Sequence, residues 1–169
     1  MIIRWKLLSI LVDTSVFYAF YNKRDVHHID SICLLTHMLE GRYGRPYTVC
    51  LVVSEAYTLL RYRIGYATAI AFLEALEKSG IKIVFLDEEG YSRVLEILKK
   101  YSDRKLSFTD ASLVYVLESY GIENMASYDE RSFSGLVARI LGKNYANTLP
   151  KEEVDRIISL TKKTSHIKF

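Results

Sequence analysis

Short apolar runs alternate with amphipathic segments along the chain, and this alternation limits the possible fold more than any other feature. The first run, residues 7–12, contains one polar residue and predicts a strand buried on both faces of a sheet. Strands that alternate with helices predict a parallel sheet with right-handed crossovers and helices on both faces. The sequence predicts strands at 7–12, 47–53, 81–86 and 124–128, with a possible edge strand at 166–169. It predicts helices at 14–21, 25–40, 55–63, 66–79, 87–101, 110–120, 133–141 and 148–163.

The composition fits one globular domain, residues 1–169, in a reducing compartment. Half of the residues are apolar, which is enough for a hydrophobic core, and the net charge of +3 does not by itself indicate a nucleic-acid partner. Cys33 and Cys50 lack metal-ligand spacing, so we expect free core thiols. Asp13 interrupts the apolar N-terminus and no cleavage site follows, so we expect a cytoplasmic protein rather than a secreted one. The absence of glutamine and the many Tyr, Ile, Lys and Glu residues suggest a thermophile source.

Four acidic residues stand where this topology brings distant parts of the chain together. Asp13 and Asp129 follow predicted strands, whereas Glu55 and Asp110 begin predicted helices. In a βαβ unit the helix starts at the carboxyl edge of the sheet, so strand ends and helix starts share the edge at which open α/β sheets bind ligands. The dipoles of the two helices would favour negative charge at Glu55 and Asp110. We therefore expect all four carboxylates at one edge of the sheet.

Each of these acids also has a purely structural interpretation. Asp13 can cap the first helix, and Asp110 can complete a capping box with Ser107. Glu55 can be an ordinary first-turn acid, and Asp129 a turn residue. Their joint placement needs more, because two carboxylates about 4 Å apart repel by roughly 4 kcal/mol at an effective dielectric of about 20. A bound cation or retained protons would relieve this repulsion, and oxygen ligands suit Mg²⁺ or Mn²⁺ rather than Zn²⁺.

Four segments resemble the motifs of the PIN-domain nucleases. They are LVDTS at 11–15, SE at 54–55, LSFTDAS at 106–112 and ASYDERSF at 126–133. The resemblance covers nearly the whole chain. It implies a single-domain α/β fold, a three-layer α/β/α sandwich around a central parallel sheet of four to five strands.

The resemblance also implies a metal-dependent endoribonuclease with one or two Mg²⁺ or Mn²⁺ ions. Asp13, Glu55 and Asp110 match the three near-invariant acids of the family's catalytic metal site, and Asp129 matches the more variable fourth. Supporting hydroxyls would come from Thr14, Ser15 and Ser127. Many family members of about this size are toxins of toxin–antitoxin pairs, which implies an antitoxin protein as partner and a homodimer. This chain is longer than most of those toxins, mainly after residue 141.

An RNA substrate requires cations near the acids. Arg61 and Arg63, on the helix of Glu55, are candidates for RNA phosphate contacts. Arg104 and Lys105, in the polar link that precedes Asp110, are candidates as well. The alternative for each is a solvated helix face. The histidines (His27, His28, His37 and His166) fall outside the predicted acidic edge, so a metal-free ribonuclease that uses histidine pairs is not expected.

Two other function classes stay open at this point. An Asp-based phosphotransfer domain of the receiver type needs an acidic pair after its first strand, and this chain has Asp13 alone there. A phosphatase with an Asp nucleophile needs a second Asp where this chain has Ser15. A non-catalytic RNA-binding or partner-binding PIN-like module would keep the fold without cleavage, and it would not need four acids.

Overall fold

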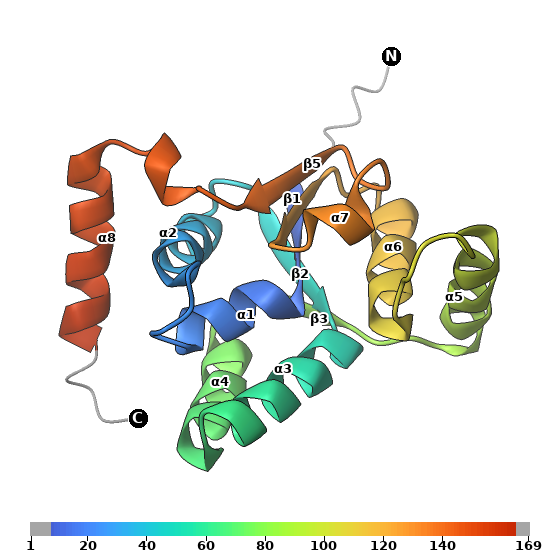
Figure 1. The fold of residues 1–169 in the computed structure, drawn as a ribbon, viewed down its shortest axis with the longest axis horizontal. Coiled ribbons are helices and arrows are strands. Elements are labelled where there is room, and N and C mark those ends of the chain that lie inside the picture. Colours follow the sequence, from blue (N-terminus) through green and yellow to red (C-terminus); the bar gives the residue numbers. More distant parts are fainter. Residues whose placement is uncertain (1–7, 165–169) are drawn as a thin grey trace.

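Five parallel strands form the sheet of the computed structural model, which describes residues 8–164 (Figure 1). The strand order is β3-β2-β1-β4-β5, so β1 lies at the centre. The strands are β1 (Ser9–Val12), β2 (Arg45–Val49), β3 (Lys82–Val84), β4 (Asn124–Ser127) and β5 (Arg139–Gly142). The predicted α/β fold with a central parallel sheet is confirmed. The predicted edge strand at 166–169 lies outside the described residues.

Helices cover both faces of this sheet. In Figure 1, α2 and α8 lie on one side of the strands, and α5 and α6 lie on the other. The helices are α1 (Thr14–Tyr21), α2 (His28–Leu39), α3 (Cys50–Arg63), α4 (Tyr66–Lys78), α5 (Glu88–Lys100), α6 (Phe108–Tyr120), α7 (Glu130–Phe133) and α8 (Lys151–Thr164), with a short 3-10 helix η1 (Ala146–Thr148). No helix within residues 8–164 is both long and apolar enough to cross a membrane.

The central strand anchors the core. Ile10, Leu11 and Val12 are fully buried, and β1 is paired with β2 on one side and with β4 on the other. Burial of each such side chain stabilises the fold by roughly 1.5–3 kcal/mol. The end of β1, where Asp13 follows, is therefore held rigidly between two neighbouring strands.

The second strand is shorter than predicted, and the helix after it begins earlier. The predicted strand at 47–53 ends at Val49, because Val49 is paired with Val84, the last residue of β3, and no partner lies beyond that point. The apolar run continues as the first turn of α3 instead, with Val52 buried. Ser54 is consequently an interior residue of α3, and the predicted start of the helix at residue 55 is wrong.

The helix predicted at 133–141 is also wrong. The apolar residues of this segment have helical spacing, but β4 offers an unpaired edge, and the chain pairs with it as β5 along its whole length. Gly142 closes this pairing at Ser127. A Cβ atom on Gly142 would lie 2.6 Å from the carbonyl oxygen of Ser127, so only glycine allows the two strands to come this close.

Two smaller differences concern α2 and the cysteines. The helix predicted from residue 25 begins at His28, because the side chain of Asp25 accepts a hydrogen bond from the His27 amide and forms a turn. Both cysteines are free thiols as predicted, with Cys33 buried and Cys50 half-buried.

Candidate active site

Asp13 stands at the carboxyl end of the central strand and accepts three hydrogen bonds. Its amide donates to the Ala126 carbonyl at 3.0 Å, which ties the residue to β4. Its Oδ1 accepts from the Thr14 amide at 2.7 Å, so Asp13 is the N-cap of α1. Its Oδ2 accepts from Ser15 Oγ at 2.7 Å and from Ser127 Oγ at 2.8 Å. These bonds use three of the roughly four acceptor positions of a carboxylate.

The surroundings of Asp13 disfavour the ionised form of its carboxyl group. Its side chain is buried, and burial raises its pKa. The hydrogen bonds from Ser15, Ser127 and Thr14 lower the pKa, and the nearby carboxylate of Asp110 raises it again, so the net direction is upward. Within residues 8–164, Asp13 forms no ion pair with a Lys or Arg side chain. A buried carboxylate without a cation favours either a retained proton or a bound metal ion.

Glu55 approaches this carboxylate from another element. It is the sixth residue of α3 and lies beyond the first turn, so the prediction that it begins a helix is wrong. Thr14 Oγ1 donates a hydrogen bond to Glu55 Oε2 at 2.7 Å. Because Thr14 directly follows Asp13, this bond holds Glu55 at the end of β1.

Asp110 combines two functions at the start of α6. Its amide donates to Ser107 Oγ at 3.0 Å, and its Oδ2 accepts from the Ser107 amide at 2.8 Å. The predicted capping box is therefore present. The same carboxylate lies near enough to Asp13 to raise the pKa of Asp13.

Asp129 lies at the border of this group. Its amide donates to Ser127 Oγ at 3.0 Å, and Ser127 in turn donates to Asp13. Its Oδ1 accepts from the Ser132 amide at 3.1 Å and caps the short helix α7. The structure thus connects Asp129 to Asp13 through one hydroxyl, and it leaves the Asp129 side chain exposed.

By their chemistry the acids suit a hard divalent cation, but within the described residues no three of them bring carboxylate oxygens within 4.8 Å of one another. The group offers carboxylate oxygens from Asp13, Glu55 and Asp110, together with hydroxyls that already orient two of them, and it contains no thiol or imidazole. Oxygen ligands of this kind suit Mg²⁺ or Mn²⁺. A cation here would also compensate the charge that burial disfavours at Asp13.

The predicted basic residues separate into two sets. Arg61 and Arg63 lie in the last turn of α3, well beyond Glu55, and the Arg61 guanidinium stacks over the Tyr66 ring at 5.4 Å. Arg104 and Lys105 line a polar cavity together with Asp129. The structure therefore brings the second pair beside Asp129, whereas the first pair lies at the far end of α3.

The comparisons with known proteins identify the family. Residues 10–137 match the family model of the PIN domain. The chain belongs to the PIN-domain family. The family predicted from the sequence motifs is thus confirmed.

Relatives of this PIN domain include ribonucleases. A VapC ribonuclease of Archaeoglobus fulgidus is 34% identical over 155 residues, which cover 90% of this chain and 95% of that protein. VapC20 of Mycobacterium tuberculosis, named a 23S rRNA-specific endonuclease, is 27% identical over 123 residues, or 71% of this chain and 88% of that protein. The crystal structure of VapC20, described as a Sarcin-Ricin loop cleaving toxin, matches with a TM-score of 0.67 at 26% identity and covers 76% of this chain and 97% of that chain. The structure of FitAcB from Neisseria gonorrhoeae matches in fold, with a TM-score of 0.55 at 19% identity over 78% of this chain and 96% of that one.

The described histidines of this PIN domain take structural positions. His28 Nδ1 contacts the Ala19 carbonyl oxygen at 2.8 Å, and the His27 ring stacks on Tyr128 with centroids 4.1 Å apart. His37 lies in a group with Glu40 and Glu153 whose potential ligand atoms all fall within 4.8 Å of one another. Arg156 already binds both of these carboxylates, which makes the group an ion-pair network rather than a metal site. His166 lies outside the described residues.

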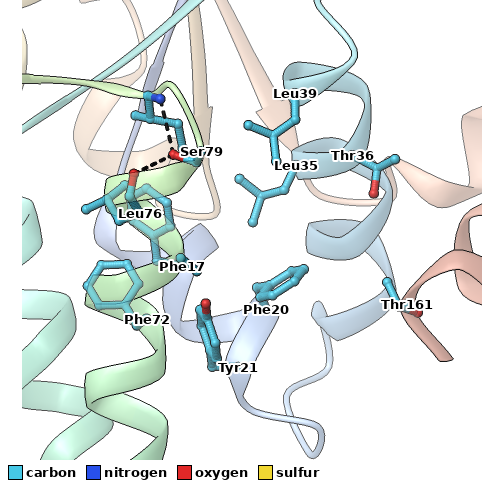
Figure 2. A pocket seen from close by; sticks show the side chains of 12 residues that line it. Phe17, Phe20, Tyr21, Leu35, Thr36, Leu39, Phe72, Leu76, Ser79 and Thr161 are labelled. Atoms are coloured by element: carbon cyan, nitrogen blue, oxygen red, sulfur yellow. Dashed lines mark hydrogen bonds between the residues drawn. The ribbon is translucent and has the colours of Figure 1, made fainter. Parts of the chain in front are cut away.

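A second cavity of this PIN domain is apolar and lies apart from the acids. Figure 2 shows aromatic and aliphatic side chains from α1, α2 and α4 converging on it, with Thr161 of α8 at its rim. Its volume is about 170 Å³. The lining has no acid, base or thiol (Phe17, Phe20, Tyr21, Leu35, Thr36, Leu39, Phe72, Ala75, Leu76, Ser79, Ile81 and Thr161), so the cavity is not a catalytic centre.

Sequence reasoning missed Arg131 and the true role of Arg104. Arg131 lines the polar cavity and lies within the ASYDERSF motif, so its place beside Asp129 could have drawn attention to it. The sequence predicts Arg104 as a phosphate contact. In the structure its Nη1 donates to the carbonyl oxygens of Ser132 at 3.3 Å and Ser134 at 2.7 Å.

Proposed function

We propose that this PIN domain is a metal-dependent endoribonuclease that hydrolyses RNA phosphodiester bonds with Mg²⁺ or Mn²⁺. One observation carries the proposal: Asp13 is buried at the end of β1 beside Asp110, and no cationic side chain among residues 8–164 pairs with either carboxylate. The relatives named as ribonucleases support an RNA substrate. The likeness to VapC20, which is described as a toxin, supports the further proposal of a toxin.

The proposed roles follow from the hydrogen bonds. Asp13 and Asp110 would hold the ion most directly, and Glu55 and Asp129 would complete the site. Ser15 and Ser127 keep Asp13 in one rotamer, while Thr14 positions Glu55. A bound Mg²⁺ or Mn²⁺ lowers the pKa of a water molecule and stabilises charge on the scissile phosphate.

The proton of the attacking water also needs an acceptor. Glu55 and Asp129 are the exposed carboxylates of the group, so they are the candidates for receiving it. In both, the side chain already has one hydrogen-bond donor, Thr14 Oγ1 or the Ser132 amide, that fixes its orientation.

The experiment that tests the function is cleavage of labelled single-stranded RNA by wild type and by Asp13→Asn, with Mg²⁺ or Mn²⁺ and with chelator. We expect metal-dependent cleavage that falls by at least about 100-fold in the variant, as for the loss of a central electrostatic group. Asp155→Asn, an exposed acid on α8, is the matched control and should cleave like wild type. Cleavage that survives both chelator and Asp13→Asn would refute the proposed site.

A toxin of this class would have an antitoxin protein as partner. We propose that the apolar cavity of Figure 2 receives an apolar segment of that protein, because it is lined by aromatic and aliphatic side chains and lies outside the proposed active site. The Leu39 side chain is half exposed at this cavity, so Leu39→Asp should abolish antitoxin binding and leave RNA cleavage intact. The homodimer stays a prediction of the family resemblance, and sedimentation equilibrium of the purified protein would test it.

A further inference from the structure

A polar cavity of about 530 Å³ opens beside the proposed active site. One wall is the link between α5 and α6, and the other is α7 with the residues around it. Asp129 belongs both to this cavity and to the group of acids around Asp13. The lining residues are Asp103, Arg104, Lys105, Asp129, Arg131, Ser132 and Ser134.

Arg104 joins the two walls of the cavity. Its Nη1 donates to the carbonyl oxygens of Ser132 and Ser134, and its guanidinium lies over the Tyr101 ring at 5.7 Å. One nitrogen makes both hydrogen bonds while the planar guanidinium lies over the Tyr101 ring, and a lysine ammonium has no planar group to stack in this way. Arg104 therefore fixes the end of α7 against the link between α5 and α6.

Lys105 and Arg131 are the unpaired cations of this cavity. Both are exposed, and neither forms a hydrogen bond or an ion pair with any residue of the described chain, although Asp103 and Asp129 line the same cavity. The Asp129 carboxylate is already engaged by the Ser132 amide. With three cationic and two acidic side chains, the lining has a net positive charge, which favours an anion as its ligand.

We propose that this cavity binds a backbone phosphate of single-stranded RNA next to the phosphate that is cleaved, with Lys105 and Arg131 as ligands and Arg104 as a positioning residue. This inference rests on the proposed function, since it assumes that the acids around Asp13 face the scissile bond. A phosphate here would find two free cations and the hydroxyls of Ser132 and Ser134 on one side of the active site. The strand would thereby be held in register across the acids.

The salt dependence of RNA binding tests the proposal. Lys105→Gln/Arg131→Gln is made in an Asp13→Asn background, so that the RNA stays intact, and its affinity for a labelled single-stranded RNA is measured by fluorescence anisotropy at several salt concentrations. The magnitude of the slope of log K against log salt should fall by about 0.7, because the variant loses the one phosphate of the cavity and each neutralised phosphate of a single strand contributes about 0.7. Binding at low salt should weaken by about tenfold.

A matched control removes the same charge elsewhere. Lys82→Gln/Lys151→Gln changes two exposed lysines, at the start of β3 and at the start of α8, that do not line the cavity. This variant should retain the wild-type slope. If the cavity variant also retains the wild-type slope, the phosphate site is refuted.

Arg104→Lys separates positioning from direct contact. The lysine keeps the charge but loses the planar group that lies over Tyr101, so the end of α7 is held less firmly against the link between α5 and α6. The magnitude of the slope should then fall because Arg131 is no longer positioned, while the melting temperature stays above the assay temperature. An unchanged slope would mean that residue 104 touches the phosphate itself, which contradicts the positioning role.

Cleavage kinetics distinguish this inference from the proposed function. In an otherwise wild-type protein, Lys105→Gln/Arg131→Gln should raise KM about tenfold with little change in kcat, because it removes binding shared by ground state and transition state. RNA cleavage by wild type with an unchanged KM in this variant would refute the inference alone. A lowered salt slope in a protein that never cleaves RNA would refute the nuclease alone.

Discussion

The carboxylate of Asp13 serves the fold and the proposed chemistry at the same time. As the N-cap of α1 it satisfies the Thr14 amide, and through Ser15 and Ser127 it connects the start of α1 to the end of β4. A helix cap contributes about 1 kcal/mol. The raised pKa of Asp13 shows that the rest of its surroundings oppose the charge, and this opposition is what a bound cation would relieve.

Asp110 allows the two functions to be separated by experiment. Asp110→Asn keeps an oxygen that can accept the hydrogen bond from the Ser107 amide, but it removes the charge that disfavours ionised Asp13. In chelator we expect its melting temperature to equal or exceed that of wild type. Asp110→Ala also removes the acceptor of the Ser107 amide, one half of the capping box, and should lower the free energy of unfolding by about 1 kcal/mol. If Asp110→Asn were destabilised as much as Asp110→Ala, the charge of Asp110 would not repel the carboxylate of Asp13.

Among the elements, α8 is attached to the rest of the molecule by the buried Ile157 and by a network of charges. Arg156 binds Glu40, the C-cap of α2, through two nitrogens, at 2.9 and 3.1 Å, and it also binds Glu153 at 2.8 and 2.9 Å. Glu153 in turn contacts the buried His37 Nε2 at 2.8 Å, and His37 Nδ1 contacts the Tyr145 hydroxyl. The network fixes the helix that follows the segment matched by the PIN family model.

Protonation of Glu153 at low pH should weaken its contacts to Arg156 and His37. Hydrogen bonds from Arg156 and His37 lower the pKa of Glu153 to about 2. A carboxyl group whose pKa is lower in the folded state stabilises the fold above its unfolded pKa of about 4.3, and this contribution is lost as the pH falls towards 2. Glu153→Gln should therefore be less stable than wild type in urea unfolding at pH 7, and the difference should vanish near pH 2. Glu152→Gln, its exposed neighbour without an ion pair in the described structure, should match wild type throughout.

The elements also show what the sequence could and could not predict. Strands β1 and β4 and helix α1 follow from apolar runs and local caps, so their predicted bounds agree with the structure within a residue or two. The boundary between β2 and α3 depends on where β3 ends, and β5 depends on the free edge of β4. Both are long-range pairing effects that no local pattern contains. The same applies to the network of His37, whose partners lie more than 100 residues away in sequence.

At the scale of the whole molecule, the strand order explains why the acids meet. β1 lies between β2 and β4, so the end of β1 is next to the ends of both neighbours, and the helices that follow them approach the same edge. Topology was therefore enough to predict that Asp13, Glu55 and Asp129 are connected at one edge of the sheet. It was not enough to predict that Glu55 is held by Thr14 from the middle of α3.

Metal binding should appear as stability of the whole fold. If Mn²⁺ binds the folded protein but not the unfolded chain, a Mn²⁺ concentration of about 100 times Kd raises the free energy of unfolding by about 2.7 kcal/mol. We expect this gain in wild type and a much smaller one in Asp13→Asn, measured by thermal unfolding at constant ionic strength. An equal gain in both proteins would locate the ion elsewhere.

The central position of β1 has a consequence for protein synthesis. Among the described strands β1 is translated first, but one of its two neighbours, β4, begins at Asn124, and the proposed site needs Asp110 and Ser127 as well as Asp13. A nascent chain that ends before residue 124 cannot complete the sheet around β1, because domains generally fold as units. The nascent chain is therefore inactive, and the proposed active site forms only when most of the chain has been translated.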